Sequence, residues 1–165
     1  MADVIKIASY ICQRYREQFG SCIDEMKLHK LLYLSQRESI VQTGEPLFVE
    51  KFKAWRYGPV LVGIRQMYKD GSIQTSAIPD DIEQYTAVFD RIFQIYASKA
   101  SWSLSSITHG EYSWQKAREG YTVDAQCDVD IETDDIRKDA ERIKTRRFLI
   151  DRISDLKNVA HENNR

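Results

Sequence analysis

The chain has little of what common catalytic and metal-binding sites need. Its seven glycines are dispersed, and none belongs to the glycine-rich loop that cradles a phosphate. Its three histidines, His29, His109 and His161, are too far apart in sequence to give the close pair of ligands typical of a zinc site. We therefore expect no metal and no other cofactor.

Cysteine is also scarce, and long apolar runs are missing. Cys12, Cys22 and Cys127 include no Cys-x-x-Cys pair, so neither a disulfide framework nor a zinc knuckle is expected. The amino terminus shows no charged-then-apolar leader, and no apolar run approaches the ~18–20 residues that span a bilayer. These absences predict a soluble, cytoplasmic protein without a membrane partner.

Neither sign of charge is in excess. Lysine and arginine total 24, aspartate and glutamate total 25, and the formal net charge is −1. This balance argues against a nucleic-acid binder that relies on a long-range positive field. The basic stretch from Arg137 to Arg147 is interleaved with Asp139 and Glu141, which is typical of a solvated helix surface. Nucleic acid is not an expected partner.

With 165 residues, of which 42% are hydrophobic, the chain suits one domain with a substantial core. Apolar periodicity with caps and stop signals predicts helices near 4–19, 24–43, 59–70, 79–96, 101–108 and 112–119, followed by a carboxy-terminal helix. Alternation near 48–55 and an extended piece at Ile73 allow short strands. The predicted fold is mainly α: a compact single-domain bundle of about six to seven helices, with room for a small two- or three-stranded β element near residues 48–56 and 73.

The carboxy-terminal segment carries two apolar faces. At 100° per residue, Ile136, Ala140, Ile143 and Ile150 share one face, whereas Leu149, Ile153, Leu156 and Ala160 share another. One straight helix cannot bury both faces in one core. Either the helix bends or ends near residues 145–148, which we prefer, or its distal half packs on a partner.

His109 is the most tempting candidate for catalysis. Thr108, Glu111 and Cys127 could approach it as nucleophile or orienting acid. A histidine next to a threonine and close to Trp114 is more often a hydrogen-bonded structural residue. We do not expect an enzyme, and a small hydrolase using His109 stays as an alternative.

Four separate sequence motifs resemble those of a known family. They are Lys27 to Tyr33 (KLHKLLY), Ala54 to Val60 (AWRYGPV), Leu104 to His109 (LSSITH) and Trp114. In this order they resemble the SocA-like antitoxin domain, or Panacea domain, of bacterial and phage toxin–antitoxin systems. The resemblance covers roughly residues 1–136, so residues 137–165 form a helical extension that packs on the same domain or on a partner.

The resemblance implies an antitoxin that neutralises a cognate protein toxin by direct binding, with a toxin that attacks translation or nucleotide pools. A proteolytic adaptor that delivers the toxin to a Clp protease is the family's other mode and stays as an alternative. Partner-binding anchors should be exposed and apolar or aromatic, which favours Tyr10 with Arg14 and the distal residues Phe148, Leu149, Ile153 and Leu156. The motif residues are assigned to the scaffold: Leu28, Leu31, Leu32, Tyr33, Trp55, Gly58, Pro59, Val60, Thr108, His109 and Trp114.

Overall fold

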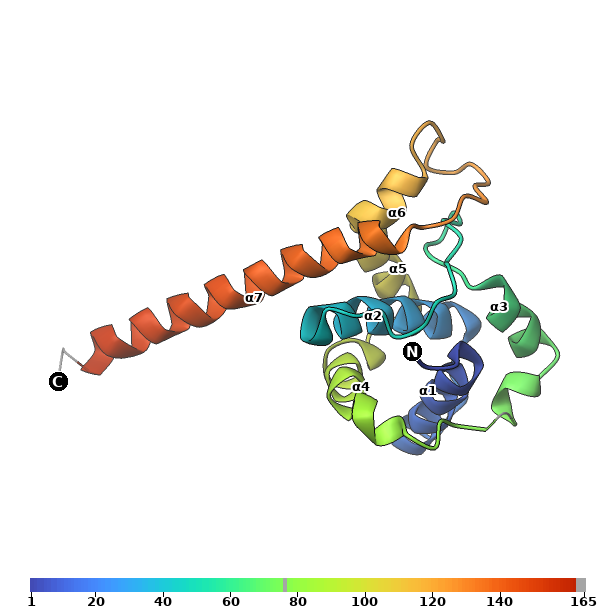
Figure 1. Cartoon of the computed structure of the whole chain (residues 1–165), viewed down its shortest axis with the longest axis horizontal. Helices are drawn as coiled ribbons and strands as arrows, with labels where there is room; N and C mark the ends of the chain where they lie inside the picture. The colour runs from blue at the N-terminus through green and yellow to red at the C-terminus, as the bar shows by residue number, and fades with distance from the viewer. Residues whose placement is uncertain (76, 163–165) are drawn as a thin grey trace.

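Helix α2 lies in the middle of the molecule, and the other helices gather around it (Figure 1). The structure is a computed structural model that describes residues 1–75 and 77–162, so residues 163–165 of the expected extension lie outside the described residues. It confirms the mainly α fold. Within the described residues, the α-helices are α1 (Val4–Phe19), α2 (Glu25–Thr43), α3 (Val62–Lys69), α4 (Thr86–Ile92), α5 (Ser101–His109), α6 (Tyr112–Ala117) and α7 (Thr133–Glu162).

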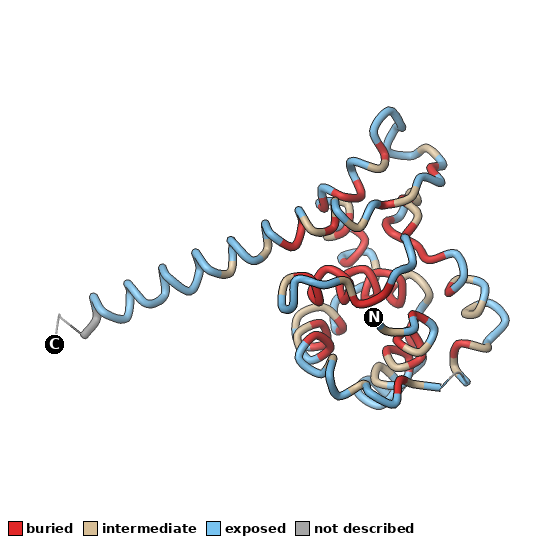
Figure 2. The backbone as a smooth tube through the Cα atoms, viewed as in Figure 1, coloured by how far each residue is buried: buried red, intermediate tan, exposed pale blue. Residues whose placement is uncertain are grey.

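Local signals set the bounds of the first two helices. The Asp3 carboxylate accepts a hydrogen bond from the Ile5 N–H at 2.8 Å, and the Asp24 carboxylate accepts one from the Lys27 N–H at 2.9 Å. Gly20 and Gly44 end α1 and α2 in the left-handed conformation. Residues 27–40 of α2 are all buried (Figure 2), so this helix is the core element against which the others pack.

The segment that joins α2 to α3 forms a tight corner, and within the described residues it has no strand. Lys53 and Val60 exchange two backbone hydrogen bonds, of 2.8 and 3.1 Å, as an isolated bridge. The bridge holds residues 59–61 extended, so α3 begins at Val62 and not at Pro59 as predicted. Ile73 is also not extended, because it is buried within the 3₁₀ turn η1 (Ser72–Gln74).

The helix predicted over residues 79–96 is divided into three pieces. A 3₁₀ turn, η2 (Ile82–Tyr85), precedes α4, and a π-helical segment, η3 (Phe93–Ala97), follows it. Such π segments often occur at functional positions because the extra residue per turn redirects side chains. Here the Tyr96 hydroxyl of η3 accepts a hydrogen bond from Arg37 of α2 at 2.8 Å.

The expected bend in the carboxy-terminal helix is wrong, because α7 runs as one helix from Thr133 to Glu162. Its first turns are buried at Ile136 and Ala140. Its distal part leaves the domain and extends into open space (Figures 1 and 2). Ile150, which shares a helix face with Ile136 and Ala140, is exposed because the helix has already left the core at that point.

Candidate partner-binding site on α7

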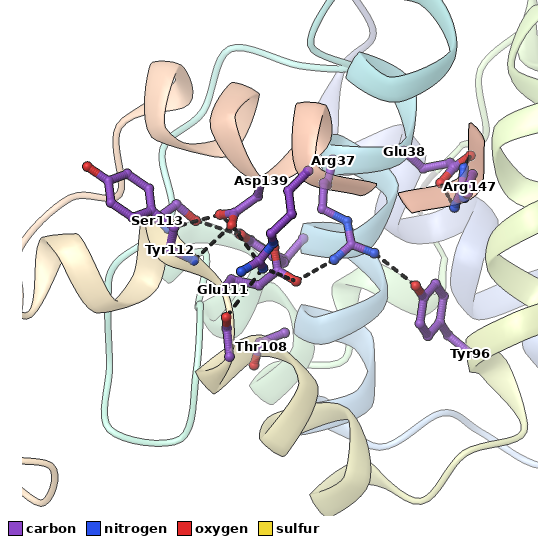
Figure 3. Close-up of polar contacts among 12 residues, drawn as sticks. Arg37, Glu38, Tyr96, Thr108, Glu111, Tyr112, Ser113, Asp139 and Arg147 are labelled. Atoms are coloured by element: carbon purple, nitrogen blue, oxygen red, sulfur yellow. Dashed lines mark hydrogen bonds and ion pairs between the residues drawn. The ribbon is translucent and has the colours of Figure 1, made fainter. Parts of the chain in front are cut away.

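Asp139 fastens the proximal part of α7 to α6. Its carboxylate is fully buried and accepts hydrogen bonds from the backbone N–H groups of Tyr112 and Ser113, at 2.8 and 2.9 Å. These are the first two N–H groups of α6, which have no partner within their own helix. The Tyr33 hydroxyl of α2 donates a third bond, at 3.3 Å. One carboxylate of α7 therefore joins three helices (Figure 3).

A buried ion pair lies beside this carboxylate. Arg37 Nη1 of α2 is 2.5 Å from Glu111 Oε1, which precedes α6, and both side chains are almost fully buried. Burial raises the pKa of the Glu111 carboxyl to about 7, against the opposing effect of the Arg37 guanidinium. Arg142 of α7 reaches the same Glu111 oxygen at 3.8 Å. The proximal part of α7 thus rests on a polar network inside the domain (Figure 3).

Among the described residues, the last ion pair of α7 with the domain joins Arg147 and Glu38. Arg147 donates two hydrogen bonds to the Glu38 carboxylate, at 2.9 and 2.7 Å. Glu38 belongs to α2 and is buried, whereas Arg147 is one-quarter exposed. From residue 148 to residue 160 every residue is exposed. The domain therefore holds α7 as far as Arg147 and leaves the rest uncovered.

The uncovered part of α7 is apolar over much of its surface. Leu149, Ile153, Leu156 and Ala160 follow one another at spacings of four, three and four residues, the spacing of a coiled-coil seam. We call these four residues the distal seam. Apolar neighbours widen it on both sides, and the following residues are each more than half exposed: Phe148, Leu149, Ile150, Ile153, Leu156 and Val159. A contiguous exposed apolar surface of this kind makes this part of α7 a candidate interaction site.

Basic residues flank the distal seam. At 100° per residue, Arg146 and Lys157 lie on one side of the seam and Arg152 lies on the other. Asp151 and Asp155 lie on the far side of the helix. The seam would therefore suit an apolar groove with acidic edges. Two copies of α7 paired through their seams would bring like charges together, which disfavours self-association.

Tyr10 is not exposed as the sequence suggested. Its ring packs against Phe89 of α4, with centroids 4.9 Å apart. Arg14 donates to the Tyr10 hydroxyl at 3.3 Å and to Asp90 at 2.8 Å, and its guanidinium lies over the Phe93 ring. The two residues join α1 to α4 and η3, because the aromatic side chain finds an apolar neighbour within the domain.

The candidate residues Phe148, Leu149, Ile153 and Leu156 lie together on α7, far along the chain from Tyr10. Sequence reasoning missed two exposed residues there, Ile150 and Val159.

The motif residues form one connected region around the corner at Gly58. The Trp114 indole N–H donates to the Trp55 carbonyl at 2.9 Å, and the Trp55 indole N–H donates to Asp128 at 3.0 Å. His109 stacks on Trp114 with ring centroids 4.3 Å apart. Trp55 and His109 are half-buried, and the following are buried: Leu28, Leu31, Leu32, Tyr33, Gly58, Pro59, Val60, Thr108 and Trp114.

The three groups considered as partners of His109 are bonded elsewhere. Thr108 donates to the Ser105 carbonyl at 2.9 Å, Glu111 pairs with Arg37, and Cys127 contacts the Ala117 carbonyl at 3.9 Å. Within the described residues, no group of three or more His, Cys, Asp or Glu side chains is placed to hold a metal ion. No helix among the same residues is long and apolar enough to cross a membrane.

Comparison with known proteins identifies the family of this helical domain. The model of a family described as antitoxin SocA-like, Panacea domain, matches residues 28–115, which is more than half of the chain. The chain therefore belongs to this family, and this membership gives it a toxin–antitoxin role. No curated protein and no solved structure matches the chain. The matched residues run from α2 to α6, so α7 lies outside the part that defines the family.

Proposed function

We propose that this protein is an antitoxin that neutralises a protein toxin by direct binding, without catalysis of its own, and that the distal seam of α7 is the contact surface. The observation that carries the proposal is the exposure of a continuous apolar helix face at the point where the domain releases α7. Burial of such a face against a partner is strongly favourable, since each large apolar side chain contributes about 1.5–3 kcal/mol when it is removed from water.

Helix-in-groove recognition suits this geometry. The exposed residues 148–160 form a rod about 20 Å long at 1.5 Å per residue, and anchors at such spacings fit an apolar groove. The Arg147–Glu38 pair and the buried network fix the direction of the rod, so little entropy is lost when a partner binds it. The basic residues along both sides of the seam favour a partner groove with acidic edges.

The test is co-expression with the product of the adjacent gene, followed by a binding assay with the two purified proteins. Ile153→Asp puts a charge into the seam, and Ser154→Asp puts the same charge one residue away, outside the seam and about 100° around the helix. We expect rescue of growth and co-purification with the wild type and with Ser154→Asp. Ile153→Asp should lose both, with affinity at least tenfold lower.

Full rescue by Ile153→Asp would overturn the assignment of the contact surface. Because the binding assay contains no protease, neutralisation by stoichiometric binding is separated from delivery to a Clp protease. Rescue that occurs only in cells with an intact Clp protease would favour the adaptor alternative.

A further inference from the structure

A second surface of the domain has the features of a binding site. A cavity of about 500 Å³ lies between the amino-terminal half of α2, the corner at Trp55–Val60 and α3. Its volume lies within the range of sites that hold a small ligand or an inserted side chain. The cavity lies at the other end of α2 from Glu38, where α7 leaves the domain. The residues of its wall that matter here are Glu25, His29, Lys30, Trp55, Arg56 and Arg65.

His29 brings an unused hydrogen-bond donor to this wall. Burial, with smaller contributions from Lys30 and Arg65, lowers the pKa of His29 to about 3, so the ring is neutral. Its Nδ1 accepts a hydrogen bond from the Leu61 N–H at 3.3 Å, which places the proton on Nε2. That Nε2 is buried and has no hydrogen-bond partner. Glu25 Oε1, also on the cavity wall, is 3.8 Å away and is engaged by Arg65.

Two basic side chains add further donors. Lys30 is almost fully buried, and its Nζ has one hydrogen bond, to the Pro59 carbonyl at 3.1 Å, although an ammonium group has three donors. No carboxylate of the described residues lies within ion-pair distance of it. The Arg56 Nη2 donates to Asp124 at 3.2 Å, but its buried Nε has no partner.

The carboxylates of the wall are already engaged. Asp24 accepts from the Lys27 N–H and from the Ser101 hydroxyl, and Glu25 pairs with Arg65. Buried donors without partners are costly unless a ligand or water supplies an acceptor. Three basic side chains line the cavity against two acidic ones, so the missing acceptor should be negatively charged.

The edge of the cavity is aromatic. Trp55 lies on the wall, and Tyr57 meets Trp102 edge-to-face with centroids 5.3 Å apart. Both Tyr57 and Trp102 are exposed. Aromatic and arginine side chains together are the composition of sites that contribute most of the energy of binding.

We propose that this cavity binds a carboxylate carried on an aromatic or apolar body. The carboxylate accepts hydrogen bonds from His29 Nε2, Lys30 Nζ and Arg56 Nε, and the body packs against Trp55 and Tyr57. Such a group occurs in a small organic acid and at the carboxyl end of a peptide chain. This inference does not depend on the role of α7.

The experiment follows the tryptophan indole and histidine ring signals by NMR while 3-phenylpropionate is added to the full-length protein. The neutral isostere 3-phenylpropionamide is the matched ligand control. We expect saturable shifts at Trp55 and His29 with the acid, and binding at least tenfold weaker with the amide. Equal binding of acid and amide, or no saturable shift, would overturn the proposal.

Two arginine variants test the residues. Arg56→Met removes the unpartnered Nε of the cavity and should weaken binding of 3-phenylpropionate about tenfold. Arg91→Met is the control, because its Nε is also buried without a partner but does not line this cavity. Undiminished binding by Arg56→Met would contradict the assignment.

The source of the carboxylate is decided with two peptides, acetyl-Ala-Phe with a free carboxyl end and the same peptide as an amide. Tighter binding of the free-acid peptide than of 3-phenylpropionate identifies a chain terminus as the natural ligand. Tighter binding of 3-phenylpropionate identifies a small acid. Failure of all the acids overturns the site and leaves the α7 proposal untouched.

Discussion

Arg147 of α7 donates two hydrogen bonds, of 2.9 and 2.7 Å, to the carboxylate of Glu38 in α2, which lies 109 residues earlier in the sequence. The pair marks the place where α7 changes from a core helix to a free one. On one side of it, Asp139 and Ala140 are buried, and beyond it residues 148–160 are exposed. The direction of the projecting helix thus depends on one ion pair at the surface and one polar network beneath it.

Replacing either partner of this pair should loosen α7. Arg147→Met leaves the buried Glu38 carboxylate with Gln42 as its remaining hydrogen-bond donor. We expect a loss of about 1–2 kcal/mol in the free energy of unfolding, less than for a fully buried pair because Arg147 is partly in solvent. Hydrogen exchange should become faster in residues 141–148 and stay unchanged in α1.

A double-mutant cycle with Glu38→Gln measures the coupling. The double variant should be more stable than the sum of the two single changes indicates, because it leaves no unpaired charge. Additive effects would mean that the pair does not hold the helix.

Asp139→Asn should destabilise the domain by about 2–3 kcal/mol. The asparagine amide keeps one acceptor, but its NH₂ would face a backbone N–H of α6 or the Tyr33 hydroxyl, and a buried donor would lose its partner. Asp155→Asn, on the exposed part of the same helix, should change stability by less than about 0.5 kcal/mol. Urea unfolding measures both. Equal stability of the two variants would show that Asp139 does not fasten α7.

The sequence predicted the helices and the buried motif residues because capping residues and apolar periodicity depend only on residues close together in the chain. Asp24 and Gly44 bound α2 in the structure much as their residue types predict. It could not pair Arg37 with Glu111, since 74 residues separate them and only the assembled fold brings them together. Sequence reasoning also preferred a bend in α7 to a partner for the distal half, because a bend lets one domain bury both apolar faces. In the structure the helix is continuous and its distal face is exposed, so that preference was wrong.

Gly58→Ala, which adds one methyl group, should lower the stability of the domain more than any other such addition in the motif region. Gly58 has φ of +106°, and an added Cβ would lie 2.6 Å from both Lys30 Cε and Thr108 Oγ1. Backbone strain and overpacking together predict a loss of about 3 kcal/mol or more.

Gly63→Ala is its matched control. Gly63 lies in α3, where an added Cβ would meet nothing within 4 Å, so alanine should stabilise the protein by about 0.5–1 kcal/mol. Thermal unfolding of the two variants should shift in opposite directions. A similar shift for both would contradict the close packing at the corner.

Lys30 should make the stability of the domain rise with pH above neutrality. Burial lowers the pKa of Lys30 to about 7, although Glu25 and Asp24 oppose the shift, whereas a lysine in the unfolded chain titrates near ~10.4. Between these values the unfolded chain binds more protons than the folded one, so raising the pH favours folding, by at most about 1.4 kcal/mol per unit. Below pH 7 both states are protonated and this contribution is constant.

The measurement is urea unfolding of the wild type and of Lys30→Met at pH 7.5 and 8.5. Both pH values lie between the pKa of Lys30 in the folded and in the unfolded chain. Burial raises the pKa of the Cys12 thiol to about 11, so stability falls as that thiol ionises in the unfolded chain from ~8.5 upward, but both proteins carry Cys12 and its effect cancels in the comparison. The wild type should gain about 1 kcal/mol more than Lys30→Met over this step, since methionine keeps the apolar stem and removes the titrating group. Parallel pH profiles would show that Lys30 stays protonated in the folded domain, with its charge balanced by Asp24 and Glu25.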